Sequence, residues 1–129
     1  MSDPVNVIFH SPSRLAIGPM IYLHWGRDGL LEYLRFALPR MRTGDVEYAS
    51  ARFIGCCHEN LPGANSLGCS NLFLPLPAED EDEFGIYEKI ISEIPAEIAK
   101  VNVDTWTVDW EGNTIQLPSE LAVKATGFG

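Results

Sequence analysis

The sequence predicts an α+β fold, in which an antiparallel sheet of about five or six strands carries two helices packed on one face. Short runs of β-branched and aromatic residues lie near both ends of the chain, and two segments of helical periodicity lie between them. Proline and glycine residues separate these segments. The length of 129 residues is close to that of one domain, so we expect residues 1–129 to form a single domain.

The first two strands are expected to form a hairpin with a long connection. Val5 to Phe9 is β-branched and aromatic, and Met20 to Trp25 has the same character. Pro12, Gly18 and Pro19 interrupt the chain between them. These two runs therefore predict paired strands.

Two helices are expected next. Apolar residues recur at helical spacing from Gly29 to Leu38, where Asp28 offers an N-cap and Pro39 blocks continuation. The second helix is expected to begin after Thr43 or Asp45. Its apolar stripe consists of Val46, Ala49, Phe53, Ile54, Cys57 and Leu61.

The middle of the chain contains residues typical of strands, of loops and of helices. Residues 68–76 have strand character, and Pro75 places this strand towards a sheet edge. Residues 78–83 are expected to form an acidic loop. Residues 84–94 fit a helix by apolar spacing, whereas Gly85 and the β-branched isoleucines fit a strand. We expect a strand in the first half of this stretch.

A C-terminal hairpin is expected over residues 101–117. Val101 to Trp110 alternates in character, which places Trp106, Val108 and Trp110 on one face of a strand. Glu111, Gly112 and Asn113 then predict a turn into Thr114 to Leu117.

Charge is distributed unevenly along the chain, whose net charge is −9. Residues 1–70 hold six arginines and six acids, whereas residues 71–129 hold three lysines and twelve acids. Such a surface repels phosphate backbones and attracts basic protein surfaces. We therefore expect a basic protein partner and no direct binding of nucleic acid.

The cysteines and the hydropathy favour a cytoplasmic protein. Cys56 and Cys57 are adjacent, and three cysteines cannot all pair, so a reducing compartment is the simplest location. The first residues do not show the pattern of a secretory signal peptide, in which a basic segment precedes an apolar one. No apolar run reaches the roughly 18 residues that a membrane span needs. Secretion and membrane insertion are not expected.

Four elements occur in a fixed order over residues 5–92. They are Ile21-Tyr22-Leu23-His24-Trp25 with Arg27-Asp28 after it, Tyr48 to Ile54, Ser66-Leu67-Gly68, and Phe84-Gly85-Ile86-Tyr87 after a run of acids. In this order and spacing the chain resembles a family of small uncharacterised bacterial and prophage proteins. The resemblance implies a cytosolic context in a mobile element and favours a strand at residues 84–91. It implies no catalytic activity.

The acidic run Glu79, Asp80, Glu81, Asp82 and Glu83 is the first candidate for a functional surface. A charge run is often only a solvated loop. Here it accompanies an acidic C-terminal half and the aromatic residues Trp106, Trp110 and Phe128. Acids with aromatic side chains suit a surface that docks on arginine-rich protein.

A second candidate is the strand-to-helix junction formed by His24, Trp25, Arg27 and Asp28. A helix N-terminus presents unpaired N–H groups to an anion, and an arginine adds a bidentate donor. A phosphate, carboxylate or nucleotide would suit this junction. The structural alternative is a core Trp25, a hydrogen-bonded His24, a capping Asp28 and a solvated Arg27.

The residue types of a zinc site occur in Cys56-Cys57-His58-Glu59 and in Cys69. Neighbours on a helix point about 100° apart, so only Cys56 and Glu59 have a useful spacing. Buried cysteine on an apolar face is the better interpretation, and neither a metal site nor a cofactor is expected. The same geometry weakens a Cys–His nucleophilic pair.

No complete catalytic motif occurs in the sequence. We therefore expect a small, non-enzymatic acidic protein that docks on a basic partner. In size and charge such a protein is similar to phage inhibitors of host defence complexes that handle nucleic acid, the anti-CRISPR class among them. The alternatives are a small-molecule or anion site at residues 24–28, with or without catalysis, and an orphan subunit with Trp106 and Trp110 in an obligate interface.

Overall fold

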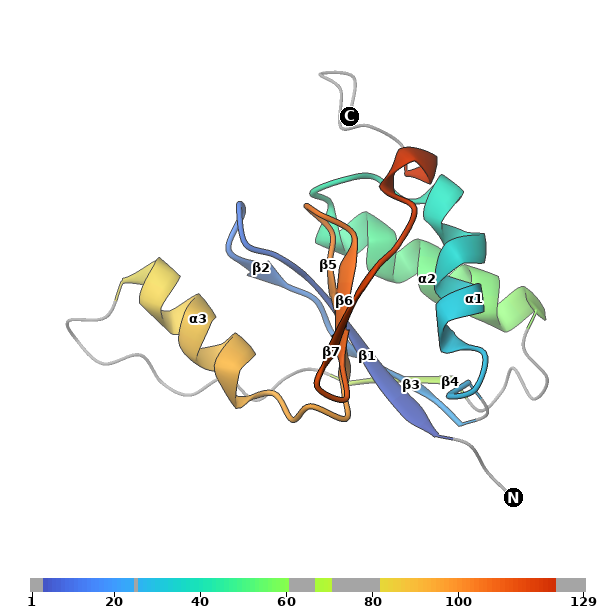
Figure 1. Cartoon of the computed structure of the whole chain (residues 1–129), viewed down its shortest axis with the longest axis horizontal. Helices are drawn as coiled ribbons and strands as arrows, with labels where there is room; N and C mark the ends of the chain where they lie inside the picture. The colour runs from blue at the N-terminus through green and yellow to red at the C-terminus, as the bar shows by residue number, and fades with distance from the viewer. Residues whose placement is uncertain (1–3, 25, 61–66, 71–81, 123–129) are drawn as a thin grey trace.

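The chain folds around one mixed β-sheet in the computed structural model, which describes residues 4–24, 26–60, 67–70 and 82–122 (Figure 1). Six strands follow the order β4-β3-β1-β5-β6-β7, and β2 pairs with β1 beside this path. The strands are β1 (Val5–Ser11), β2 (Ala16–Ile17), β3 (Met20–Leu23), β4 (Leu67–Ser70), β5 (Ala99–Asn102), β6 (Thr107–Trp110) and β7 (Asn113–Gln116). The expected α+β fold is confirmed.

The two central strands, β1 and β5, are parallel, with Phe9 beside Val101 in the register. The other paired strands are antiparallel, including the expected pair of β1 and β3. Parallel neighbours need a long crossover connection, and the helices between β1 and β5 supply it. The sheet is thus mixed rather than wholly antiparallel, because this long-range pairing leaves no local signal in the sequence.

Two helices cover one face of the sheet, as expected. They are α1 (Leu30–Ala37), which continues into the short 3-10 helix η1 (Leu38–Arg40), and α2 (Val46–Asn60). The rings of Phe9 on β1 and Phe53 on α2 meet edge to face at 5.4 Å. Val7, Leu34 and Val101 belong to the same buried cluster, so this face holds the main core.

The starts of the two helices differ in their caps. Gly29 is the N-cap of α1 and no side chain bonds there, so Asp28 is not the cap that the sequence suggests. Asp45 caps α2, since its Oδ1 accepts the N–H of Tyr48 at 3.0 Å. Thr43, the other candidate cap, instead accepts a hydrogen bond from Trp106.

Residues 83–93 form a third helix, α3 (Glu83–Glu93), so the prediction of a strand over the first half of residues 84–94 is wrong. The Asp82 side chain accepts the N–H of Gly85 at 2.7 Å and caps this helix. Tyr87 and Ile90, one turn apart, are its buried residues. The cap and the helical spacing outweigh the β propensity of the isoleucines.

The predicted continuous strand from Val101 to Trp110 is also wrong, because the chain turns between β5 and β6. The Asn102 side-chain oxygen accepts the N–H groups of Asp104 and Thr105, and Trp106 has a φ of 58°. The predicted hairpin is therefore a meander of β5, β6 and β7. The second turn, at Glu111 and Gly112, has φ values of 52° and 80° and lies where the sequence predicts it.

The remaining described elements are the edge strand β4 and the short 3-10 helix η3 (Ser119–Leu121). The strand predicted over residues 68–76 is present up to Ser70, and residues 71–76 lie outside the described residues. Leu61, at the end of the predicted stripe of α2, also lies outside them. Among the described helices, none has both the length and the apolar character needed to cross a membrane.

Candidate functional site

Helix α3 lies on the face of the sheet opposite to α1 and α2 (Figure 1). Side chains alternate along β1, so Phe9 faces the main core and His10 faces the other side. There His10 Nδ1 bonds to the Tyr87 hydroxyl of α3 at 2.5 Å. This buried hydrogen bond ties α3 to the central strand of the sheet.

The imidazole of His10 is buried, with 5% of the residue exposed, and its Nε2 has no hydrogen-bond partner. Burial lowers the pKa of His10 below its ordinary value of 6.5, and Asp109 and Asp104 partly oppose this effect. Burial also raises the pKa of Tyr87 to about 12, with smaller contributions from Asp104 and Glu88. Both groups are therefore neutral near pH 7, and Asp104 lies near enough to affect the pKa of each.

The exposed residues of α3 and of its N-cap are mostly acidic and include one aromatic ring. Asp82, Glu83, Glu88 and Glu93 are exposed, and Lys89 is the basic residue among them. Phe84 lies between these acids and is 55% exposed. An exposed ring within a charged surface is typical of a contact surface for another molecule.

The sheet face beside α3 adds further acids. The register places Asp109 of β6 opposite Lys100 of β5, on the face that also carries His10. Asp104 follows β5 and is held by Ser11, whose hydroxyl donates to it at 2.8 Å. Over α3 and this part of the sheet the acids outnumber the lysines. We call this region, formed by Asp82, Glu83, Phe84, Glu88, Glu93, Asp104 and Asp109, the acidic surface.

Three arginines, Arg40, Arg42 and Arg52, lie on the layer of α1, η1 and α2, on the other side of the sheet from α3. Arg42 and Arg52 lie over the ring of Tyr48 at 4.3 and 4.7 Å, and Arg40 lies over Phe36 at 5.1 Å. These contacts keep several guanidinium groups on the helical layer, although Glu32 and Glu47 are exposed there too. These three arginines therefore do not neutralise the acidic surface.

The acidic run of the sequence is only partly described. Glu79, Asp80 and Glu81 lie outside the described residues, whereas Asp82 and Glu83 form the start of α3. The sequence also extends the charge of this run through Glu88, Glu93 and Glu97, and the structure adds Phe84, Asp104 and Asp109. Helical spacing of Tyr87 and Ile90 was the available signal for placing Phe84 and Glu88 on an outer face.

Neither of the two tryptophans predicted to contact a partner is a freely exposed ring. Trp106 is 1% exposed and donates from Nε1 to Thr43 at 3.0 Å, so its prediction as an exposed docking residue is corrected. The turn before β6 directs its side chain into the main core. Trp110 is half-buried and donates to the Glu97 carbonyl at 3.1 Å. Phe128 lies outside the described residues.

At the predicted anion site, Arg27 forms an ion pair with Glu111 and lies 5.5 Å from the ring centre of Trp110. His24 Nδ1 bonds to the Tyr22 hydroxyl at 2.8 Å. Asp28 is exposed, and Trp25 lies outside the described residues. The ion pair with Glu111 reduces the positive charge that Arg27 can offer an anion, so this geometry favours a structural role for Arg27.

The cysteines divide into two buried thiols and one exposed thiol. Cys56 and Cys57 are buried on α2, as the sequence indicates, and burial raises the pKa of Cys57 to about 12. Cys69 on β4 is exposed. Within the described part of the chain, no three His, Cys, Asp or Glu side chains are grouped in a way that could hold a metal ion.

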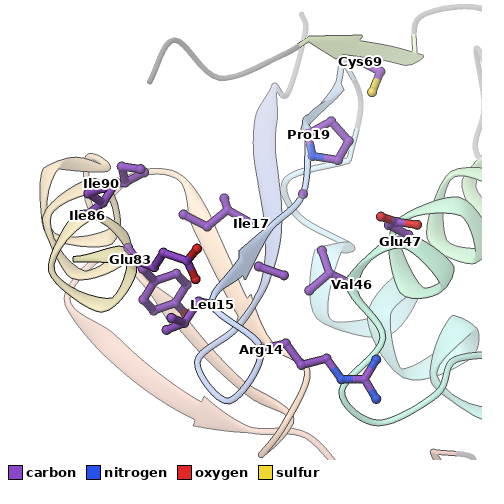
Figure 2. Close-up of a pocket in the computed structure, with 13 residues that line it drawn as sticks. Arg14, Leu15, Ile17, Pro19, Val46, Glu47, Cys69, Glu83, Ile86 and Ile90 are labelled. Carbon is purple, nitrogen blue, oxygen red and sulfur yellow. The ribbon is translucent and has the colours of Figure 1, made fainter. Parts of the chain in front are cut away.

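A groove of about 930 Å³ opens between α3 and the β1–β2 hairpin, at the edge of the sheet (Figure 2). Its walls are residues 14–19 of the hairpin, the start of α2 and the inner side of α3, and Cys69 lies at one end. We call this the edge groove. No local pattern in the sequence predicts this groove, because three segments far apart in the chain form its walls.

No protein family model matches the chain, and no curated protein or solved structure matches it either.

Proposed function

We propose that this protein is a non-enzymatic binding protein whose acidic surface docks on a basic surface of a protein partner. The observation that carries this proposal is the composition of α3, where exposed acids surround the exposed ring of Phe84. Carboxylates attract a basic partner over about one Debye length, and the ring supplies apolar area at the contact.

The position of the arginines supports the same proposal. Arg40, Arg42 and Arg52 are stacked on aromatic rings of α1 and α2, which lie across the sheet from α3. These three arginines are therefore held away from the acidic surface. We extend the proposal to partners that normally hold nucleic acid, such as host defence complexes inhibited by small acidic phage proteins, because such partners present basic surfaces of this kind.

Matched charge variants test the acidic surface. Glu88→Gln with Glu93→Gln removes two carboxylates from α3, and Glu32→Gln with Glu120→Gln removes the same charge from α1 and η3. Each protein is used to capture partners from a bacterial lysate at low salt, followed by elution in a salt gradient. We expect the α3 variant to elute at clearly lower salt than the wild type and the control variant to elute almost unchanged.

A second variant addresses the apolar part of the contact. Phe84→Ser leaves the charge unchanged, and it should raise the Kd for the captured partner by roughly tenfold, as for a central aromatic residue of an interface. If the affinity for the captured partner is indifferent to salt and to all these changes, the acidic surface is not the docking site.

A further inference from the structure

The edge groove runs along the side of β2 that no strand of the described residues covers. Strand β2 pairs with β1 on one side, and among the described residues it has no strand on its other side. The groove follows this edge, because residues 15–19 line it from one end of β2 to the other. An open strand edge offers backbone donors and acceptors to an added strand.

The two walls of the groove, one on each side of β2, have a similar composition. On the α3 side the groove is lined by Glu83, Ile86, Tyr87 and Ile90, and on the α2 side by Val46 and Glu47. Figure 2 shows Ile17 of β2 directed towards α3, and Val46 and Glu47 on the other side of the strand. Each side therefore combines apolar walls with one exposed carboxylate.

Arg14 is the basic residue of the groove lining. Its guanidinium lies beside Gly44, in the loop that precedes α2, and Figure 2 shows it directed away from α3. The α3 side of the groove thus keeps the negative charge of Glu83 without a basic neighbour in the lining.

Resting on the docking function proposed above, we infer that the edge groove binds an extended basic segment of the protein partner, which adds as a strand beside β2. Successive side chains of a strand point to opposite sides. Two adjacent basic residues would therefore reach Glu83 and Glu47, one on each side, while apolar neighbours pack on Ile86, Ile90 and Val46. The volume of about 930 Å³ lies within the range of about 300–1,000 Å³ usual for ligand sites.

Cys69 provides a built-in reporter for this inference. It lies at the end of the groove and is the exposed cysteine, whereas Cys56 and Cys57 are buried. The rate of alkylation of Cys69 by iodoacetamide therefore reports whether the groove is covered. The burial that raises the pKa of Cys57 to about 12 keeps that thiol unreactive.

The probe is a short capped peptide with two adjacent arginines between valine and leucine residues. At a peptide concentration of about ten times its Kd, alkylation of Cys69 should slow by roughly tenfold, because only about a tenth of the protein is free. A peptide with glutamates in place of the arginines should give no protection. A peptide with glycines in place of valine and leucine should protect far less.

Variants of the groove walls complete the test. Glu83→Gln and Glu47→Gln should each weaken binding of the arginine peptide by roughly two- to fivefold, as for a partly exposed ion pair. Ile86→Arg should abolish protection, since it places a cation in the groove. Glu120→Gln, on η3 and outside both the groove lining and the acidic surface, should leave the Kd within about twofold.

The outcomes separate this inference from the docking function. If lysate capture depends on Glu88 and Glu93 but the peptide does not protect Cys69, the groove inference is overturned and the acidic surface stands. If the peptide protects Cys69 while lysate capture ignores Glu88 and Glu93, the groove stands and the acidic surface fails. Equal protection by free arginine overturns the assignment of a peptide strand.

Discussion

His10 connects the central strand of the sheet to α3 through its hydrogen bond to Tyr87. Its Nδ1 is bonded to Tyr87, and its Nε2 is the buried side-chain atom without a partner in the described part of the chain. A buried imidazole in this state is held neutral, because protonation would place an unsolvated charge inside the protein. The attachment of α3 is thus sensitive to protonation of one residue.

Acidification is expected to destabilise the fold through His10. Because burial lowers its pKa below 6.5, the folded protein binds fewer protons than the unfolded chain between the folded pKa and pH 6.5. The stabilisation is complete above pH 6.5 and is lost as the pH falls through the folded pKa. Urea unfolding at about pH 7.5 and about pH 5.5 should show a lower midpoint at the lower pH. His10→Gln should show a smaller difference, and an equal difference would exclude this role for His10.

Trp106 and Trp110 are expected to differ in their effect on stability. Trp106 fills the core, so Trp106→Ala should lower the free energy of unfolding by about 3–5 kcal/mol. Trp110 is half-buried, and Trp110→Ala should cost about 1 kcal/mol, an ordinary value for a partly exposed residue. Chemical denaturation of both variants checks this order. Similar costs would contradict the placement of Trp106 in the core.

In α3, a local N-cap favours a helix in a segment whose sequence is compatible with either a helix or a strand. The sequence Phe84 to Ile94 contains both a helical stripe and β-branched residues, and propensity alone favours neither. Asp82 satisfies the N–H of Gly85, and the sheet then buries Tyr87 and Ile90 on one side. The capping residue Asp82 is present in the sequence, but it lies within the segment predicted to be an acidic loop.

Replacing the cap should loosen α3 without unfolding the sheet. Asp82→Ala is expected to destabilise the helix by about 1 kcal/mol, whereas Asp82→Asn retains a capping oxygen and should cost less than about 0.5 kcal/mol. Amide hydrogen exchange along residues 83–93 measures this difference. Unchanged exchange in both variants would show that Asp82 does not hold the start of the helix, and equal losses would point to its charge instead.

In the meander of β5, β6 and β7, by contrast, a regular sequence pattern predicts one continuous strand where the structure has a turn. Alternation of apolar residues from Val101 to Trp110 continues through a turn. Asn102 bonds to the N–H groups of the turn, and Trp106 adopts a positive φ that a tryptophan rarely takes. Burial of the Trp106 ring beside Thr43 stabilises this conformation, and that contact joins segments about sixty residues apart.

The concentration of acidic residues on one side of the molecule should make both its thermal stability and its partner binding depend on salt. Acids of α3 and the adjoining sheet repel one another, so raising NaCl from about 0.02 M to about 0.5 M should raise the melting temperature by a few degrees. The same change should weaken partner binding by roughly tenfold or more. Glu88→Gln with Glu93→Gln should show a smaller thermal gain. A melting temperature that falls with salt would contradict net repulsion.

Local patterns in the sequence were enough to predict the α+β class, both helices of the main layer, the β1–β3 pair and the turn at Gly112. They also located the excess of acids in the second half, since composition does not depend on folding. The parallel pairing of β1 with β5, the burial of Trp106 and the walls of the edge groove depend on contacts between distant segments. Such contacts are chosen by the total burial and hydrogen bonding of the assembled chain, and no single stretch of sequence records that sum.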